Sequence, residues 1–124
     1  MILYDASVFI NHARDQKLDC SAHILDLTYY EVGNALWKQV TKLKILDSAG
    51  AAATIELLKD WENVLQLRAS DLQGIFGSAT ELNISFYDAT YVFYAKKHGF
   101  ELHTCDKVLY EKAKNVVKTE FVRC

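Results

Sequence analysis

The sequence predicts an α/β fold, in which a central, mostly parallel sheet of four to five short strands is flanked by helices. Short apolar runs alternate with longer segments of helical periodicity, which is typical of βαβ units. The 124 residues contain no proline, no Gly/Ser-rich linker and no repeat that would divide them. Because this length suffices to bury one hydrophobic core, we expect a single domain over residues 1–124.

The first half of the chain alternates between strand and helix patterns. Residues 1–5 (MILYD) are a short apolar run that stops at an aspartate, and residues 6–15 follow with helical spacing. A second strand is expected at 23–27, then a helix at 28–44 and an alanine-rich helix at 47–60. The apolar residues of the helix at 28–44 recur every three or four positions and define one face: Tyr29, Val32, Leu36, Val40 and Leu43.

The second half of the chain repeats the alternation. The expected strands are 64–68, 100–104 and 116–122. The expected helices are 70–82, 86–98 and 106–115. The helix at 86–98 is apolar nearly all round, which predicts that it is buried. Parallel strands joined through helices require right-handed crossovers, so this order of elements leaves few topologies open.

Several acidic residues have a purely structural explanation as helix caps. Asp106 directly precedes the helix at 106–115, where its carboxylate can accept hydrogen bonds from free N–H groups. Four other pairs match the capping box, in which a Ser or Thr is followed three residues later by an acid or amide. These pairs are Thr28 with Glu31, Ser70 with Gln73, Ser78 with Glu81, and Ser85 with Asp88.

Composition narrows the class of protein. The net charge of −2 and the pI near 6.0 argue against a protein that coats nucleic acid through general basicity. No apolar run approaches the roughly 20 residues of a membrane span, and the N-terminus lacks the basic region of a signal peptide. We therefore expect a cytoplasmic protein without membrane contact. The three cysteines show no CxxC spacing, which predicts neither a disulfide framework nor a zinc site.

Four acids are candidates for one site. Asp5 and Asp106 follow two predicted strands, and in open α/β sheets ligands bind outside the carboxyl ends of the strands. Asp88 begins the buried helix, so it should lie near the mouth of the core. Glu31 belongs to a polar stripe on the helix at 28–44, with Asn34, Lys38 and Lys42. This stripe is either a solvated face or a path on which the two lysines contact phosphates.

Four converging carboxylates would repel one another, and a divalent cation removes that repulsion. Hard cations such as Mg²⁺ and Mn²⁺ prefer oxygen ligands, and one or two of them suit phosphodiester hydrolysis beside an open groove. A cation also explains how an acidic site can accept an acidic polymer. The acids therefore indicate a metal-dependent nuclease.

The whole chain resembles the PIN-domain ribonucleases, and among them the VapC toxins of prokaryotic toxin–antitoxin modules. The motifs that carry the resemblance are YDASVFIN, EVGNAL, YDATYVFYAKKHG and HTCDKVLYEKA, in this order. The resemblance places the four acidic positions of the family on Asp5, Glu31, Asp88 and Asp106. It implies a PIN-like fold in which three aspartates bind Mg²⁺ or Mn²⁺, while Glu31 holds a second metal or orients water. Thr104 and Ser7 would support the ligands through hydrogen bonds, and Asn34 matches a further polar position.

The resemblance also implies partners. Proteins similar to VapC are commonly homodimers that cleave RNA and are held inactive by a VapB antitoxin, which often presents a basic side chain to the acids. The chain departs from the family in lacking a proline before the helix of Glu31. The cysteine between Thr104 and Asp106 and the four histidines are not at motif positions, so we expect them to pack or to lie on the surface.

Other functions remain open. A phosphatase of the haloacid dehalogenase type would require a second aspartate where Ser7 stands, and a receiver domain would require a strand rather than a helix around Asp88. A PIN-like module that binds RNA or protein without catalysis keeps the same pattern. An RNA-processing PIN nuclease without an antitoxin does so too.

Overall fold

The computed structural model describes all residues from 1 to 124. Its five strands all pair in parallel, and they are β1 (Ile2–Tyr4), β2 (Ile24–Leu25), β3 (Val64–Leu65), β4 (Glu101–Thr104) and β5 (Thr119–Phe121). One sheet has the order β1-β4-β5, and β2 pairs with β3 in a second. A parallel bridge between Leu3 and His23 joins the two, so the strands run β3-β2-β1-β4-β5 across the molecule. The predicted fold class is confirmed.

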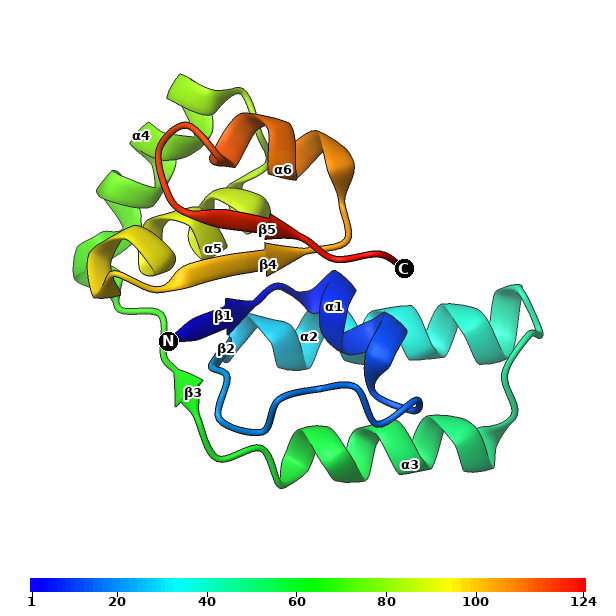
Figure 1. Cartoon of the computed structure of the whole chain (residues 1–124). Coiled ribbons are helices and arrows are strands. Elements are labelled where there is room, and N and C mark those ends of the chain that lie inside the picture. Colours follow the sequence, from blue (N-terminus) through cyan, green and yellow to red (C-terminus); the bar gives the residue numbers. More distant parts are fainter.

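Six α-helices flank these strands: α1 (Ala6–His12), α2 (Leu27–Trp37), α3 (Ser48–Lys59), α4 (Leu72–Leu82), α5 (Phe86–His98) and α6 (Lys107–Ala113). A short π-helix (Lys38–Lys42) continues α2, and a 3₁₀ turn (Ala69–Asp71) precedes α4. Figure 1 shows α1 beside the end of β1, with α2 and α3 on the same side of the molecule, whereas α4, α5 and α6 lie on the side of β4 and β5. Every predicted helix is present. None of them is both long enough and apolar enough to cross a membrane.

The core forms where the central strands meet α1 and α5. Leu3 of β1 and Leu102 of β4 are fully buried, and Phe9 of α1 packs edge-on against the Trp61 ring. Helix α5 is buried along most of its circumference, as its sequence predicts, through Ala89, Thr90, Tyr91, Val92, Tyr94 and Ala95. The buried indole of Trp61 donates to the carbonyl of Ala22 at 2.9 Å, so this ring also satisfies its polar atom.

The outer part of α2 differs from its predicted apolar face. Val32 and Leu36 are buried, but Tyr29 remains 42% and Leu43 53% exposed. For Leu43 the reason is visible in Figure 1, where α2 and its continuation extend beyond the sheet together with α3, whereas Tyr29, in the first turn of α2, has no such explanation. The end of this helical pair has no layer of the same chain to pack against, so amphipathic spacing alone does not bury it.

Three of the four predicted capping boxes do not cap a helix. Two of them do not lie at the start of an α-helix, and in the third another residue is the N-cap. Ser70 lies in the 3₁₀ turn and Ser78 lies inside α4. Helix α2 begins after Asp26, whose carboxylate accepts from the Leu27 N–H, while Thr28 is buried. Tertiary contacts decide these ends, because Asp26 also accepts from the Leu67 N–H beyond β3.

The remaining two cap predictions are confirmed. Ser85 caps α5, with its hydroxyl accepting from the Asp88 N–H at 3.0 Å. Asp106 caps α6, with Oδ1 accepting from the N–H groups of Val108 and Leu109. Asp106 is therefore a structural cap, whatever else it does.

The expectation that Cys105 serves only packing, in a chain without a disulfide framework, is wrong. Cys105 follows β4 and Cys124 follows β5, and the two are joined by a disulfide. The parallel pairing of Thr104 with Phe121 brings the segments after both strands side by side. Spacing rules miss this pair because 19 residues separate the cysteines along the chain.

The turn from α5 into β4 depends on Gly99. Its φ of +69° is in the left-handed region, and the N–H of the next residue, Phe100, returns to the Ala95 carbonyl at 2.8 Å. This closure ends α5 and directs the chain into β4. A Cβ on Gly99 would meet no atom within 4 Å, so only the backbone conformation demands glycine there.

Two alanine substitutions isolate this backbone effect. Gly99→Ala should lower the free energy of unfolding by about 1–2 kcal/mol, the cost of a left-handed residue with a side chain. Gly77→Ala, inside α4 and equally free of steric contacts, should raise it by about 0.5–1 kcal/mol. Urea denaturation measures both values. Equal effects of the two substitutions would contradict the role assigned to Gly99.

Candidate functional site

Asp5 lies where β1 ends and α1 begins. Its Oδ1 accepts from the Val8 N–H at 3.2 Å and from the Ser7 hydroxyl, which makes it the N-cap of α1. Its Oδ2 accepts from the Thr104 hydroxyl, which comes from the neighbouring strand β4. Asp5 as a whole residue is only 4% exposed, and these donors hold its carboxylate in one position at the end of the sheet.

Asp106 is connected to Asp5 through Thr104. The Thr104 hydroxyl accepts from the Asp106 N–H at 3.0 Å while it donates to Asp5. Because Asp106 Oδ1 caps α6, the hydrogen bonds of that carboxylate to the helix leave Oδ2 uncommitted. Asp106 is exposed, in contrast to Asp5. The two aspartates thus stand at the ends of adjacent parallel strands.

Glu31 and Asp88 come from the two helices that face this edge. Glu31, in the second turn of α2, accepts from the Tyr91 hydroxyl at 2.7 Å. The same hydroxyl lies 2.9 Å from the hydroxyl of the buried Thr28. Tyr91 is on the buried face of α5, one turn beyond Asp88, so it links α5 to α2. Its hydrogen bond orients the Glu31 carboxylate.

Burial and mutual repulsion raise the pKa of three of these acids. Desolvation is the main cause for Asp5, whose pKa is raised further by the charge of Asp88. Desolvation also raises the pKa of Glu31, with contributions from the charges of Asp88 and Asp5. The pKa of Asp88 is raised by burial and then by the charge of Asp106. Each carboxylate therefore lies close enough to another to disfavour its ionised form.

The cluster has no cation of its own. None of the six ion pairs in the structure includes Asp5, Glu31, Asp88 or Asp106. Their oxygens do not form a tight cage, since the one trio of candidate ligand atoms mutually within 4.8 Å is elsewhere, at His12, Cys105 and Cys124. An open set of carboxylates fits Mg²⁺ or Mn²⁺, because Mg²⁺ keeps several waters and takes few direct protein ligands.

A hollow beside Glu31 extends the site outward. Its volume is about 450 Å³, and Glu31, Asn34 and Lys38 of the predicted polar stripe line it. Two tyrosines also line it, Tyr30 with 78% and Tyr87 with 58% of the residue exposed. Lys42 does not line the hollow, and its ammonium lies 5.6 Å from the Trp37 ring centre. A larger cavity of about 590 Å³ contains none of the four acids.

Sequence reasoning missed three polar residues of this region. Tyr91 appears in the sequence as a buried position of a buried helix, with no sign that its hydroxyl binds Glu31. Tyr30 and Tyr87 have no motif of their own, and their exposure at one hollow depends on how α2 packs near α5. The sequence positions of Tyr30 and Tyr87 were a usable signal, because Tyr30 directly precedes Glu31 and Tyr87 directly precedes Asp88.

Comparison with known proteins identifies relatives. No model of a known protein family matches the sequence. Two proteins of Pyrobaculum aerophilum, named exonuclease VapC9 and ribonuclease VapC3, are 38% and 37% identical to it over 97 and 92 residues. These alignments cover 78% and 73% of this chain, and 71% and 70% of the relatives.

Solved structures of other proteins are also similar to this chain. The crystal structure of PAE2754 from Pyrobaculum aerophilum superposes with a TM-score of 0.79 at 32% identity, over 94% of this chain and 82% of that one. The structure of VapBC2 from Rickettsia felis, bound to a DNA fragment from its promoter, gives a TM-score of 0.66 at 14% identity, over 98% of both chains. The second likeness concerns the fold alone, whereas the relatives share sequence as well. The chain belongs to the VapC family of PIN-domain proteins.

Proposed function

We propose that the chain is a divalent-metal-dependent endoribonuclease and the toxin of a type II toxin–antitoxin system. The observation that carries this proposal is the meeting of four carboxylates, from four different parts of the chain, without a cationic side chain among them. A cluster kept only for stability would be expected to pair its buried charges. The names of the two relatives, an exonuclease and a ribonuclease, support nuclease chemistry.

We assign the metal to Asp5, Asp88 and Asp106, and a water-orienting role, or a second metal, to Glu31. Ser7 and Thr104 hold Asp5 through their hydroxyls, and Tyr91 holds Glu31. When bound, Mg²⁺ or Mn²⁺ supplies a Lewis acid that polarises a phosphoryl oxygen and lowers the pKa of a bound water. Glu31, whose pKa is raised by burial, would be a suitable acceptor for the proton of an attacking water.

The RNA is proposed to pass through the hollow beside Glu31. Asn34 and Lys38 can contact its phosphates, and Tyr30 and Tyr87 offer exposed rings on which bases can stack. Stacking on aromatic rings requires unpaired bases, so the substrate is single-stranded at the cleavage position. Lys42 is further out, on the Trp37 ring, and is the weaker candidate for a phosphate contact.

Two protein partners belong to this proposal. A VapB-type antitoxin would place a basic side chain among the unpaired carboxylates, where a guanidinium can replace the metal as counter-charge. The solved VapBC2 complex supports such a partner. We assign the homodimer contact to the apolar surface formed by Leu72 and Phe76 of α4 and Phe86 of α5, all of which are exposed.

The second candidate function is a PIN-like module that binds RNA without cleaving it. Its specific support is the spacing of the acids, whose oxygens do not form a tight ligand cage. Cleavage assays separate the two functions, because a silent module would bind single-stranded RNA and leave it intact with either metal.

Asp88→Asn should abolish cleavage, because it removes one ligand charge while keeping nearly the same shape. We expect the rate on mixed-sequence single-stranded RNA in Mg²⁺ or Mn²⁺ to fall by more than about 100-fold, beyond the effect of losing an outer partner of a metal ligand. Asp60→Asn, an exposed acid beyond α3, is the matched control and should cleave normally. Cleavage that survives in both variants, or in EDTA, would sink the proposal.

The stability of the metal-free protein should depend on pH through Asp88. Its raised pKa means that the folded protein binds this proton more tightly than the unfolded chain does. The stabilisation from protonated Asp88 is present below the ordinary pKa of aspartate and is lost as pH rises through the raised value. In EDTA, Asp88→Asn should match the wild type near pH 4 and be more stable at pH 7. Urea unfolding at both pH values tests this, and a constant difference would contradict it.

Tyr30→Ala and Tyr87→Ala should each weaken the binding of single-stranded RNA, because a base loses its stacking partner. A loss of about 1–3 kcal/mol per base corresponds to roughly 5- to 150-fold in affinity. The measurement is fluorescence anisotropy in the Asp88→Asn background, where RNA stays intact. Tyr29→Ala is the control, since Tyr29 is also exposed on α2 but does not line the hollow. If all three variants bind alike, the RNA takes another path.

A further inference from the structure

A second cluster of reactive side chains lies beside the carboxylates and has no part in the proposed hydrolysis. The disulfide between Cys105 and Cys124 joins the segments after β4 and β5, with the two Cα atoms 5.8 Å apart. That separation is typical of a disulfide. Cys124 is exposed, whereas Cys105 is partly buried, so an external thiol meets the Cys124 sulfur first.

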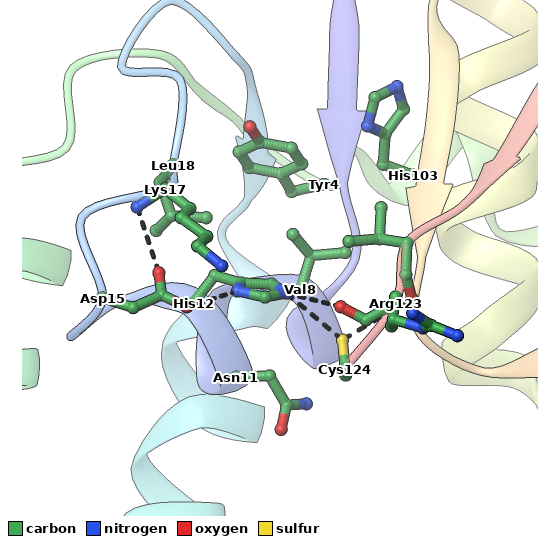
Figure 2. Close-up of a pocket in the computed structure, with 11 residues that line it drawn as sticks. Tyr4, Val8, Asn11, His12, Asp15, Lys17, Leu18, His103, Arg123 and Cys124 are labelled. Atoms are coloured by element: carbon green, nitrogen blue, oxygen red, sulfur yellow. Dashed lines mark hydrogen bonds and ion pairs between the residues drawn. The ribbon is translucent and has the colours of Figure 1, made fainter.

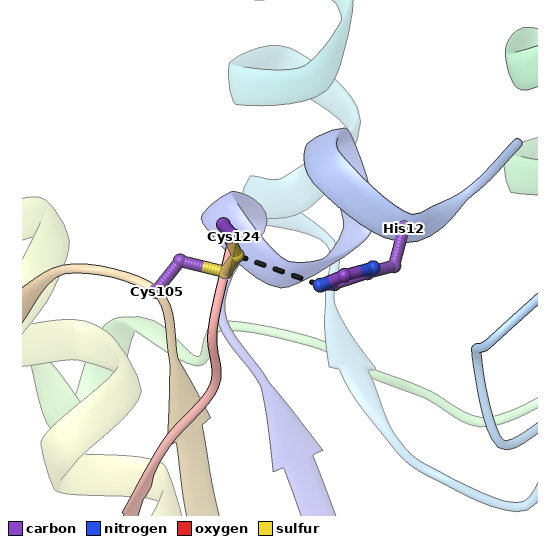
Figure 3. Close-up of side chains that lie close together, drawn as sticks. All are labelled: His12, Cys105 and Cys124. Atoms are coloured by element: carbon purple, nitrogen blue, oxygen red, sulfur yellow. Dashed lines mark hydrogen bonds between the residues drawn. A yellow bond between two sulfur atoms is a disulfide. The ribbon is translucent and has the colours of Figure 1, made fainter. Parts of the chain in front are cut away.

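His12 faces this disulfide from α1, as Figure 3 shows. Its Nε2 lies 3.6 Å from the Cys124 sulfur and 3.0 Å from the Arg123 carbonyl. Its Nδ1 lies 2.7 Å from an Asp15 carboxylate oxygen, which fixes the ring. A protonated imidazole at this distance stabilises a thiolate, which makes the sulfur a better leaving group.

The cluster opens onto a cavity that is distinct from the hollow beside Glu31. Figure 2 shows His12 and Cys124 at the wall of this cavity, between α1 and the segment after β5. Its volume is about 590 Å³, and Lys17 and Arg123 add positive charge to its lining. A small dithiol, or an exposed dithiol of another protein, can therefore reach the Cys124 sulfur.

The disulfide is connected to the carboxylate site through one residue. Cys105 lies between Thr104 and Asp106, and its N–H donates to the Ser7 hydroxyl at 2.9 Å. Ser7 and Thr104 both donate to Asp5. The bond to Cys124 thus restrains the segment that carries one candidate metal ligand and supports another.

We infer that Cys105, Cys124 and His12 form a thiol–disulfide exchange site, and that the redox state of this site controls how firmly Asp5 and Asp106 hold a cation. The exchange chemistry is independent of the proposed ribonuclease function, and the control of cation binding rests on the metal assignment made above. The substrate class of the exchange site is a dithiol reductant.

The exchange proceeds in two balanced steps. A thiolate of the reductant attacks the Cys124 sulfur, an S–S bond forms between them, and Cys105 leaves as a thiolate that takes up a proton. The second thiol of the reductant then loses its proton and attacks the reductant sulfur of the mixed disulfide, and Cys124 leaves beside His12 as a thiolate that takes up this second proton. The dithiol becomes a disulfide, and two electrons and two protons pass to the protein.

Counting thiols tests the site without any nuclease assay. In the unfolded, air-oxidised chain we expect one titratable thiol, the exposed Cys20, and after reduction we expect three. Cys20→Ser should change these counts to none and two. Three thiols in the oxidised wild type would overturn the disulfide.

The rate of reduction tests His12, and cation affinity tests the coupling. His12→Gln should slow the complete reduction of the folded protein by dithiothreitol about 10-fold, because the Cys124 thiolate that leaves in the second step loses its partner. Reduction should lower the melting temperature by several degrees and weaken Mg²⁺ affinity, measured by calorimetry, about 10-fold. Cys124→Ser should reproduce the reduced state with or without dithiothreitol, and it should fold because Cys124 is exposed.

These outcomes separate failure of the coupling from failure of the proposed function. If the disulfide forms but Mg²⁺ affinity is the same in both redox states, the coupling is wrong and the ribonuclease proposal stands. If neither state binds Mg²⁺, the metal assignment fails, and the thiol counts still decide whether the exchange site exists. An unchanged reduction rate in His12→Gln would remove His12 from the site.

Discussion

The parallel pairing of β1 with β4 is the constraint on which the site depends. Tyr4 pairs with His103, so the residues that follow them, Asp5 and Thr104, lie next to each other at the same end of the sheet. There the Thr104 hydroxyl donates a hydrogen bond to the Asp5 carboxylate. Both strands pass directly into helices there, and each helix needs acceptors for its free N–H groups. Asp5 and Asp106 supply them. A one-residue shift of this pairing would turn the side chains to the other face.

Capping and cation binding are compatible because they use different oxygens. Asp106 caps α6 with Oδ1, which leaves Oδ2 without a hydrogen bond to the helix. Both carboxylate oxygens of Asp5 accept hydrogen bonds, and the residue is buried, so this carboxylate is the most constrained of the cluster. The protein thus positions these acids through helix caps that it needs in any case. The remaining conflict is charge repulsion, which burial intensifies and which a cation relieves.

Two chemically different groups of side chains are adjacent at this end of the sheet. The carboxylate oxygens suit hard cations, whereas the sulfur and imidazole of the neighbouring cluster suit thiol chemistry and soft metals. One residue, Cys105, separates them, because its sulfur turns toward Cys124 while its N–H donates to Ser7. The side chain and the backbone N–H of this one residue therefore serve different clusters.

The sequence by itself determined the α/β class and the five strands and six helices in order, because apolar periodicity is a local pattern, and it predicted the four acids of the candidate site. It also identified Asp106 and Ser85 as caps, since capping is a contact within one turn. Only the tertiary structure decided that Thr28 is buried rather than a cap, that Tyr91 orients Glu31, and that Cys105 pairs with Cys124. Each of these contacts joins residues 19 or more positions apart, and their geometry follows from how the helices and strands pack.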